Sequence, residues 1–318
     1  MEIRAWTEVR EILGRTSSQQ SHSQRTSLFL EVNEDGYRGV GEIAPHDVAI
    51  WFDPARAEVL RYLQSFLVQR LDGRRGEGSS VLHLTDASSV ARPAAALLEM
   101  ALVDWSLQRD GRVVEEEFNG TYRVERQLTR SALSPSSEAP ATGAVRIKVA
   151  PWTTADQIGS LAEHASTVIL DVNGDVADRQ TIGLWLTALR ADQLRAVEQP
   201  VRPGDWNSSV PLVEAGIPIF LDESIRTVTD VRHAAKYRCA SGVCVKVERV
   251  GGFAMAARVI SEAQERGLDV YLGGFFESPW AKRWMHAFAT QFALGPSDVG
   301  EGVTAERPEP SGDVIRIV

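Results

Sequence analysis

Five charged residues recur through the second half of the sequence at intervals of about one strand and one helix. Lys148, Asp171, Glu198, Asp222 and Lys246 are separated by 23, 27, 24 and 24 residues. Each lies near the end of a short apolar run, where a charge is costly unless it is paired or binds a ligand. The carboxyl ends of successive strands meet at one rim of a β/α barrel, so we expect the five side chains to face a common centre.

The three carboxylates of this set predict a metal site. Asp171, Glu198 and Asp222 would repel one another and shift one another's pKa if they converged without a counter-charge, so the arrangement makes sense around a cation. Ligands that are all oxygen favour Mg²⁺, or Mn²⁺, over zinc. The alternative is that the three acids are unrelated surface residues at strand ends.

Two lysines flank the acids. Lys148 lies two residues after Arg146 in VRIKVA, and the period of two places both side chains on the same face of the strand. A neighbouring guanidinium and a metal favour the neutral amine that a general base needs, so Lys148 is a candidate base. Lys246 lies in VCVKV, a run too apolar for an exposed strand, and should approach the centre from the opposite side.

The elements that must position these residues follow from the pattern of the chain. Short β-rich runs alternate with helical patterns, which predicts βαβ units and an α/β fold with a parallel sheet. Either a barrel or a doubly wound sheet would fit this order, and the repeated charges at the run ends favour the barrel. The runs are VRIKVA, STVILDV, LRAVEQPV, IPIFLDESI, SGVCVKV and LDVYLGG.

The first third of the chain has a different pattern. Residues 26–32 and 36–45 predict a hairpin with a turn at 33–36, whereas the Ser/Gln-rich residues 15–27 lack periodicity and predict a mobile loop. Residues 54–71 have one apolar helical stripe, and residues 91–111 predict a buried helix that ends at Gly111.

These patterns predict two domains. An α+β capping domain should comprise residues 1–95 and be completed by the tail 300–318, and a β/α barrel should comprise residues 96–299. The Ser/Pro/Ala cluster at 131–142 predicts a flexible connection, and the charged EEEF at 115–118 predicts a solvated end.

Composition excludes several classes of function. The 318 residues are 43% hydrophobic and 24% charged, which is typical of a globular protein, and the net charge of −9 disfavours nucleic acid or anionic membrane as a partner. The two cysteines, Cys239 and Cys244, are too few for a disulfide framework and should be buried small apolar side chains. No signal peptide or membrane span is apparent, so we expect a cytoplasmic protein that acts on a small molecule.

Several motifs together resemble the enolase superfamily, in the branch of muconate-lactonizing-like enzymes with a Lys-x-Lys pair on the second barrel strand. The resemblance covers most of the chain and implies a modified TIM barrel with an α+β capping domain. The motifs are GVGEIAP at 39–45, LLEMALVDWSLQRDG, VRIKVA, ILDVNGD, AVEQP, FLDESI and VCVKVERVGG.

Within this superfamily the chain most resembles the o-succinylbenzoate synthase family, in its actinobacterial form, through IKVAP, DESIR and VKVxxxGG. The resemblance implies a lyase of menaquinone biosynthesis that uses Mg²⁺ to dehydrate 2-succinyl-6-hydroxy-2,4-cyclohexadiene-1-carboxylate to 2-succinylbenzoate. Lys148 would take the proton α to the carboxylate and return it to the departing hydroxide, while Lys246 would stabilise the enolate. The implied metal ligands are Asp171, Glu198 and Asp222, with Asn173 and Glu223 beside two of them.

The resemblance is weakest where substrate would bind. By position in the family, Arg25 and residues Gly273, Gly274 and Ser278 would contact the substrate. Arg146 replaces the first lysine of the pair and cannot act as a base near neutral pH. The segment GTYRVERQLTRSAL does not resemble the usual apolar first strand of the barrel, and GGFFESP stands where serines are common.

Three alternatives remain open from sequence. The chain could be an N-acylamino acid racemase or dipeptide epimerase of the same superfamily, because Lys148 and Lys246 could supply bases on both faces of a substrate. A cycloisomerase is a more distant option. A catalytically silent barrel that acts as a binding or scaffold protein is the third, and the oligomeric state stays open.

Overall fold

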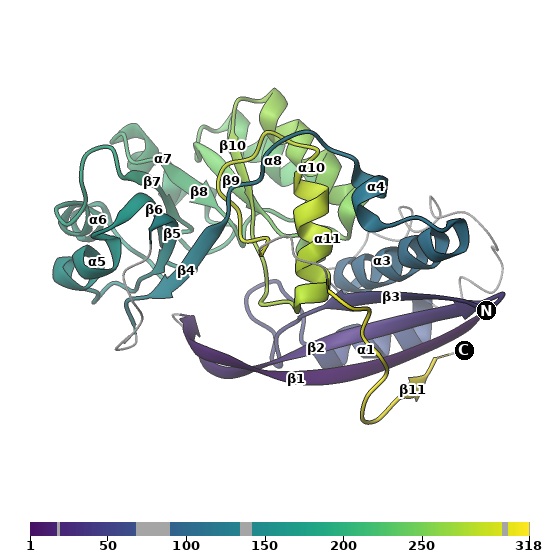
Figure 1. The fold of residues 1–318 in the computed structure, drawn as a ribbon. Coiled ribbons are helices and arrows are strands. Elements are labelled where there is room, and N and C mark those ends of the chain that lie inside the picture. The colour runs from purple at the N-terminus through teal and green to yellow at the C-terminus, as the bar shows by residue number, and fades with distance from the viewer. Residues whose placement is uncertain (18–19, 68–89, 134–141, 301–304, 318) are drawn as a thin grey trace.

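The fold has two parts, a curled parallel sheet with its helices and a separate antiparallel sheet along one side of it (Figure 1). The computed structural model describes residues 1–17, 20–67, 90–133, 142–300 and 305–317. The predicted α/β class, a modified barrel with an α+β capping domain, is confirmed. The boundary that we placed at residues 95 and 96 falls inside one long helix and stays a prediction.

The parallel sheet contains seven strands among the described residues, in the order β10-β9-β8-β7-β6-β5-β4. Residues 295–298 close it, because Gly295 and Asp298 donate to β10 while Ser297 is bridged to the residue before β4. The segment that did not resemble a first strand nevertheless contains β4. Its buried side chains, Gln127, Thr129 and Ser131, are polar and alternate with partly buried ones. The strands are β4 (Gln127–Ser131), β5 (Gly143–Lys148), β6 (Ala165–Asp171), β7 (Leu194–Glu198), β8 (Ile219–Leu221), β9 (Gly242–Val245) and β10 (Asp269–Leu272).

Five of the helices that follow these strands begin at side-chain caps that are visible in the sequence. Thr154, Asp178, Asp205, Thr227 and Ser278 each accept a hydrogen bond from a backbone N–H in the first turn of the helix that they precede. No helix within the described ranges is long and apolar enough to span a bilayer. The helices are α5 (Ala155–Ala162), α6 (Arg179–Leu186), α7 (Trp206–Glu214), α8 (Val228–Lys236), α9 (Val247–Val250), α10 (Phe253–Glu265) and α11 (Pro279–Ala289).

The antiparallel sheet has the order β11-β1-β2-β3, with β1 (Glu2–Ser17), β2 (Gln20–Glu34), β3 (Tyr37–Ile43) and β11 (Ile315–Arg316). The predicted hairpin of β2 and β3 is confirmed, and its turn uses left-handed backbone at Asp35 and Gly36. The predicted mobile loop at residues 15–27 is wrong for its described residues. They belong to β1 and β2, which pair as far as Ser17 and Gln20. Each strand satisfies the backbone hydrogen bonds of the other, although the side chains show no apolar alternation.

Helix α3 (Ala91–Asp110) lies against the antiparallel sheet, as the buried helix predicted from sequence. Gly39 and Gly41 on β3 make this close approach possible, because a Cβ at either position would collide with the backbone of α3. Val40 between them donates to the Asp104 carboxylate on α3. The glycines of GVGEIAP are therefore explained by packing of the capping domain.

The remaining predicted elements have mixed outcomes. The predicted helix at 54–71 contains α1 (Arg56–Tyr62) followed by a π-helical turn, η1 (Leu63–Leu67), and its last residues lie outside the described ranges. The acidic EEEF forms α4 (Val114–Phe118), whose glutamates are exposed while Phe118 packs against barrel aromatics. The predicted flexible connection falls mostly on residues 134–141, which lie outside the described ranges.

Carboxylates that are buried or partly buried link the capping sheet and α3 to the barrel helices that follow. Glu248 on α9 accepts a hydrogen bond from the Ala44 backbone at 2.9 Å, and Glu99 on α3 accepts from the backbone at the start of α10. Glu42 on β3 accepts from the backbone and hydroxyl of Ser278. Burial raises the pKa of Glu99 to about 7 and that of Glu248 to about 8.

These shifts predict that the protein loses stability as the pH rises. From pH 4.5 to about 7 for Glu99, and to about 8 for Glu248, the folded protein keeps a proton that the unfolded chain releases. The free energy of unfolding therefore falls by up to about 1.4 kcal/mol per pH unit for each group within its range. Urea unfolding at pH 6 and pH 8 should show this decline. Glu248→Gln should reduce the slope, whereas Glu265→Gln on an exposed face should leave it unchanged; equal slopes in all three proteins would contradict the assignment.

Candidate active site

The register of the parallel sheet places the predicted charged residues at one end of the barrel. Lys148 is aligned with Asp171, and Asp171 with Glu198, across β5, β6 and β7. Asp222 directly follows β8, and Lys246 directly follows β9. All five side chains are buried. The structure therefore brings the whole set together, and the chemical roles of its members stay predictions.

The residues two positions before the three acids and Lys246 form a layer beneath this set, as the period of two requires. Ile169, Ala196, Phe220 and Cys244 pack together with Tyr271 of β10 inside the barrel. This layer is apolar apart from the Tyr271 hydroxyl, which donates to Glu198. Arg146, two positions before Lys148, is a buried cation beside Asp171 and Glu198. The predicted burial of both cysteines is confirmed.

Each carboxylate has cationic partners within the protein. Asp171 Oδ2 lies 2.9 Å from Lys148 Nζ, and Asp222 Oδ2 lies 2.8 Å from Lys246 Nζ. Glu198 Oε1 lies 3.7 Å from Arg146 Nη1. Mutual repulsion of the acids therefore does not by itself require a metal, because these side chains already balance much of the negative charge.

The electrostatics of Glu198 and Asp222 differ sharply. Burial and the neighbouring carboxylate of Asp171 raise the pKa of Glu198 well above its ordinary value. Burial would also raise the pKa of Asp222, but the charges of Arg249 and Lys246 outweigh it and lower that pKa. Glu198 is thus the carboxylate of this site that most lacks positive charge.

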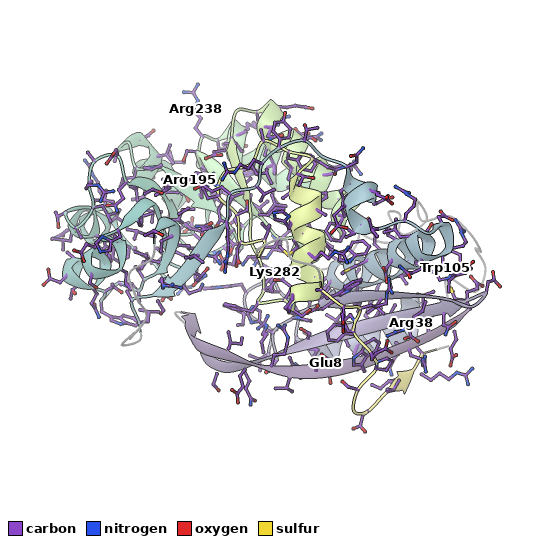
Figure 2. The ribbon with its side chains drawn as sticks, viewed as in Figure 1. Glu8, Arg38, Trp105, Arg195, Arg238 and Lys282 are labelled. Carbon is purple, nitrogen blue, oxygen red and sulfur yellow. The ribbon has the colours of Figure 1, made fainter. Side chains whose placement is uncertain are left out.

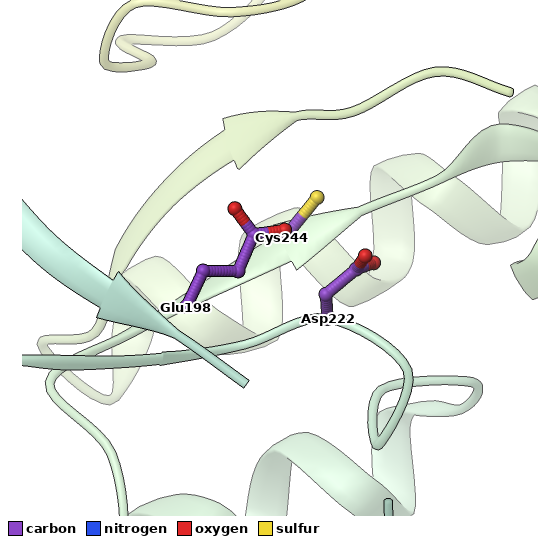
Figure 3. A group of neighbouring side chains, drawn as sticks. All are labelled: Glu198, Asp222 and Cys244. Atoms are coloured by element: carbon purple, nitrogen blue, oxygen red, sulfur yellow. The ribbon is translucent and has the colours of Figure 1, made fainter. Parts of the chain in front are cut away.

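The geometry at Glu198 fits a divalent cation. Glu198 Oε1 is buried and has no hydrogen-bond partner among the described residues, while Oε2 accepts from the Tyr271 hydroxyl. Ligand atoms of Glu198, Asp222 and Cys244 lie within 4.8 Å of one another, and Figure 3 shows the three side chains converging. Burial keeps Cys244 a thiol by raising its pKa, so the carboxylates are the natural ligands of a hard cation. Asp171 does not join this group as placed and faces Lys148 instead.

Lys148 is held by two acceptors. Its Nζ donates to Asp171 Oδ2 at 2.9 Å and to Asn173 Oδ1 at 2.8 Å. Asn173 has left-handed backbone, with φ of 53°, and its amide reaches Glu223. Burial, followed by the charge of Asp222, raises the pKa of Glu223 to about 7. Asn173 and Glu223 therefore lie next to the lysine and the acids, and their role at a metal site stays a prediction.

Lys246 stands on the other side of the site. Its Nζ lies 4.5 Å from the centre of the Phe275 ring, which is a cation–π contact. Burial disfavours its charge, but the carboxylate of Asp222 raises the pKa of Lys246 above its ordinary value. Gly273 supplies the space for its chain, because a Cβ there would lie 3.1 Å from Lys246 Cε and 2.5 Å from Cys244 Sγ.

Gly273→Ala should therefore displace Lys246. Overpacking of this kind destabilises a protein by about 1–3 kcal/mol, and turnover should fall as well because the ammonium moves. Chemical unfolding and a turnover assay measure the two effects. Gly183→Ala on α6 is the matched control, since nothing lies within 4 Å of a Cβ at that position. Unchanged stability and turnover in Gly273→Ala would show that Lys246 and Cys244 do not pack tightly against residue 273.

A pocket opens above the charged set. It is lined by residues of the barrel rim and of the segment between β3 and α1: His46, Ile50, Trp51, Asp53, Arg146, Lys148, Asn173, Glu223, Lys246, Arg249, Gly274, Phe275 and Phe276. The segment from the capping domain forms the roof, and Trp51 contacts Gly174 after β6. Trp51, Asn173, Gln199 and Phe276 all have left-handed backbone, so strained residues gather around this pocket.

Of the predicted substrate-binding residues Arg25, Gly274 and Ser278, one lines the pocket and two lie outside its lining. Gly274 lines the pocket. Arg25 is buried beneath the roof, where it contacts His46 Nδ1 at 2.9 Å and donates to the Ala44 carbonyl. Ser278 caps α11 and donates to Glu42, and so joins the two domains. The structure gives Arg25 and Ser278 supporting contacts, and their part in substrate binding stays a prediction.

Sequence reasoning missed several residues at the site. Gln199 accepts hydrogen bonds from the backbone of Asp222 and Ser224, and so aligns the ends of β7 and β8. Its position directly after Glu198, at the end of a predicted strand, could have indicated from sequence that Gln199 belongs to the site. Lys282 on α11 bonds to Asp298, which in turn lies 3.3 Å from Arg146; Figure 2 shows Lys282 at the end of α11 nearer the capping sheet.

Comparisons with known proteins identify the family of the chain. Residues 137–308 match the family described as Enolase C-terminal domain-like, which is more than half of the chain. The chain belongs to the enolase superfamily. It is 26% identical to an o-succinylbenzoate synthase of Enterococcus faecalis over 86% of this chain and 78% of that protein. It is 24% identical to an N-succinylamino acid racemase of Thermus thermophilus over 80% and 73% of the two chains.

A solved structure supports the same fold for this member of the superfamily. The L-Ala-D/L-Glu epimerase of Bacillus subtilis superposes with a TM-score of 0.80 at 20% identity, over 99% of this chain and 95% of that one. The superfamily relatives thus include enzymes of different reaction classes. The resemblance to the superfamily found in the motifs is confirmed, and the specific reaction is a separate question.

Proposed function

We propose that this protein is a metal-dependent enzyme that dehydrates 2-succinyl-6-hydroxy-2,4-cyclohexadiene-1-carboxylate to 2-succinylbenzoate. The observation that carries the proposal is the placement of Lys148 and Lys246 at the ends of β5 and β9, with three buried carboxylates on the strands between them. The similarity to the Enterococcus faecalis synthase supports the choice of substrate.

Asp171, Glu198 and Asp222 would hold Mg²⁺, which would supply positive charge next to the carboxylate of the substrate. Lys148 takes the α-proton. A neutral amine has two N–H bonds and one lone pair, and its hydrogen bonds to Asp171 and Asn173 use both N–H bonds and leave the lone pair for the substrate.

A single base can account for both proton transfers in the remaining steps. When the α C–H bond breaks, its electron pair forms the enolate, which the ammonium of Lys246 stabilises from the other side. When the C–O bond breaks, Lys148 returns its proton to the departing hydroxide, and water leaves. The pocket walls of Phe275 and Phe276 offer an apolar surface for the ring of the substrate.

A racemase of N-succinylamino acids is the second candidate, because Lys246 stands opposite Lys148 and a racemase relative matches most of the chain. One experiment separates the two. The purified protein with Mg²⁺ is assayed for 2-succinylbenzoate formation, and beside this for exchange of the α-proton of N-succinylamino acids in deuterated water. We expect dehydration to be the faster reaction. Exchange without dehydration would favour the racemase, and neither reaction would favour a scaffold protein.

A further inference from the structure

One guanidinium connects the roof of the pocket to a proposed metal ligand. Arg249 on α9 binds the Asp53 carboxylate through two contacts, Nε to Oδ1 at 2.9 Å and Nη2 to Oδ2 at 2.7 Å. Its Nη1 donates to Asp222 Oδ1. Asp53 belongs to the capping domain, whereas Arg249 and Asp222 belong to the barrel, so this chain of three side chains crosses the domain interface.

The charges along this chain balance only when Asp53 is present. Asp222 faces two cations, Lys246 and Arg249, and its side chain is fully buried. The side chain of Arg249 is 3% exposed, so solvent screens it little. Asp53 supplies the second negative charge. Without it, Asp222 and its neighbour Glu223 would face two buried positive charges, and both charges would oppose the binding of a further cation at Asp222.

The backbone holds Asp53 in place for this contact. Ile50 and Asp53 exchange backbone hydrogen bonds at 3.1 and 2.9 Å, which closes a tight turn. Trp51 within that turn has left-handed backbone and rests on Gly174 of the barrel. On the barrel side, the ring of Phe275 lies 5.1 Å from the Arg249 guanidinium. Each partner of this ion pair therefore has supporting contacts of its own.

We propose that Asp53 is a positioning residue that, by pairing with Arg249, leaves Asp222 able to bind a divalent cation. The inference rests on the metal site of the proposed function. It adds that the capping domain contributes to the affinity of that site although it provides no ligand. Loss of a hydrogen-bonding partner of a metal ligand typically weakens metal binding by about 10–100-fold, and Asp53 acts one residue further out, through Arg249.

The test is a calorimetric titration of Mg²⁺ into metal-free protein, without substrate. Asp53→Asn keeps the shape of the side chain and removes its charge, and we expect the Kd for Mg²⁺ to rise by about 10-fold or more. Asp53→Glu should recover much of the affinity because it restores the charge. Asp47→Asn is the matched control, since Asp47 lies in the same segment but pairs with Arg56, away from the barrel.

A double-mutant cycle separates this role from a structural one. In an Arg249→Met background, Asp53→Asn should change the Kd by less than about twofold, because the charge that Asp53 neutralises is gone. A role in folding alone would lower the unfolding midpoint of Asp53→Asn without changing its Kd for Mg²⁺. Asp53→Ser, which is smaller and also uncharged, serves for the same comparison if the asparagine variant does not fold.

The outcomes distinguish this inference from the proposed function. If the unmodified protein binds no Mg²⁺ or Mn²⁺, the proposed function itself fails. If the unmodified protein binds Mg²⁺ and Asp53→Asn binds it equally well, the proposed function stands and the role of Asp53 is overturned. A weaker Kd in Asp53→Asn that persists unchanged in the Arg249→Met background would also overturn it, because the effect would not pass through Arg249.

Discussion

Replacement of Lys148 by arginine is expected to abolish turnover, although it retains the positive charge. The proposed elimination needs a group that accepts the α-proton and then returns it, and a guanidinium stays protonated near neutral pH. Lys148→Ala should be equally inactive. Loss of a positioned acid–base group typically costs about 10²–10⁴-fold in rate, and the rate of 2-succinylbenzoate formation measures it.

Lys246→Arg is the matched variant, because Lys246 is proposed only to stabilise charge. It should keep part of the turnover, so the two arginine variants should differ by about 2 kcal/mol or more in transition-state energy. Equal and complete loss in both variants would instead favour a two-base racemase. Substantial turnover in Lys148→Ala would eliminate the mechanism.

The barrel and the charged set could be predicted from sequence because both depend on local patterns. Apolar runs of strand length recur with helical segments between them, and each run ends in a charge that an apolar strand would not tolerate without a partner. Register then follows from the parallel sheet, which aligns Lys148, Asp171 and Glu198. The positions of these residues could therefore be predicted without information on contacts between distant segments.

The extension of β1 and β2 could not be predicted in the same way. Residues 15–27 contain serine, threonine and glutamine without apolar alternation, so their sequence carries no strand signal. The backbone of the described residues among them pairs across a short hairpin, as Arg10 with Arg25 shows. Hydrogen bonding of the backbone, which does not depend on side-chain type, decided the structure there.

Contacts between distant segments explain the other omissions. Arg249 is 196 residues from Asp53, and Tyr271 is 73 residues from Glu198. Neither pair has a sequence spacing that indicates contact. The sequence also does not show that protein cations already neutralise the acids, because this depends on how Lys148, Lys246 and Arg249 are oriented in the folded chain.

Glu198→Gln is expected to reduce turnover by roughly a thousandfold or more, since a lost metal ligand removes several kcal/mol of charge stabilisation in the transition state. Glu198 Oε1 is buried without a hydrogen-bond partner among the described residues, and the amide of glutamine would bring less negative charge to that position. Treatment with EDTA should have a similar effect on the unmodified protein, and added Mg²⁺ or Mn²⁺ should restore its turnover. Titration of metal against turnover measures both results.

Cys244→Ser is the matched control for this prediction. Cys244 lies in the same cluster as Glu198 and Asp222, but a hard cation prefers carboxylate oxygen to a thiol. The serine variant should therefore keep its affinity for Mg²⁺ and most of its turnover. Loss of Mg²⁺ binding in Cys244→Ser, with binding retained in Glu198→Gln, would show that the ligands are misassigned. Full turnover in Glu198→Gln, or in protein stripped of metal, would remove the basis for a metal-stabilised enolate.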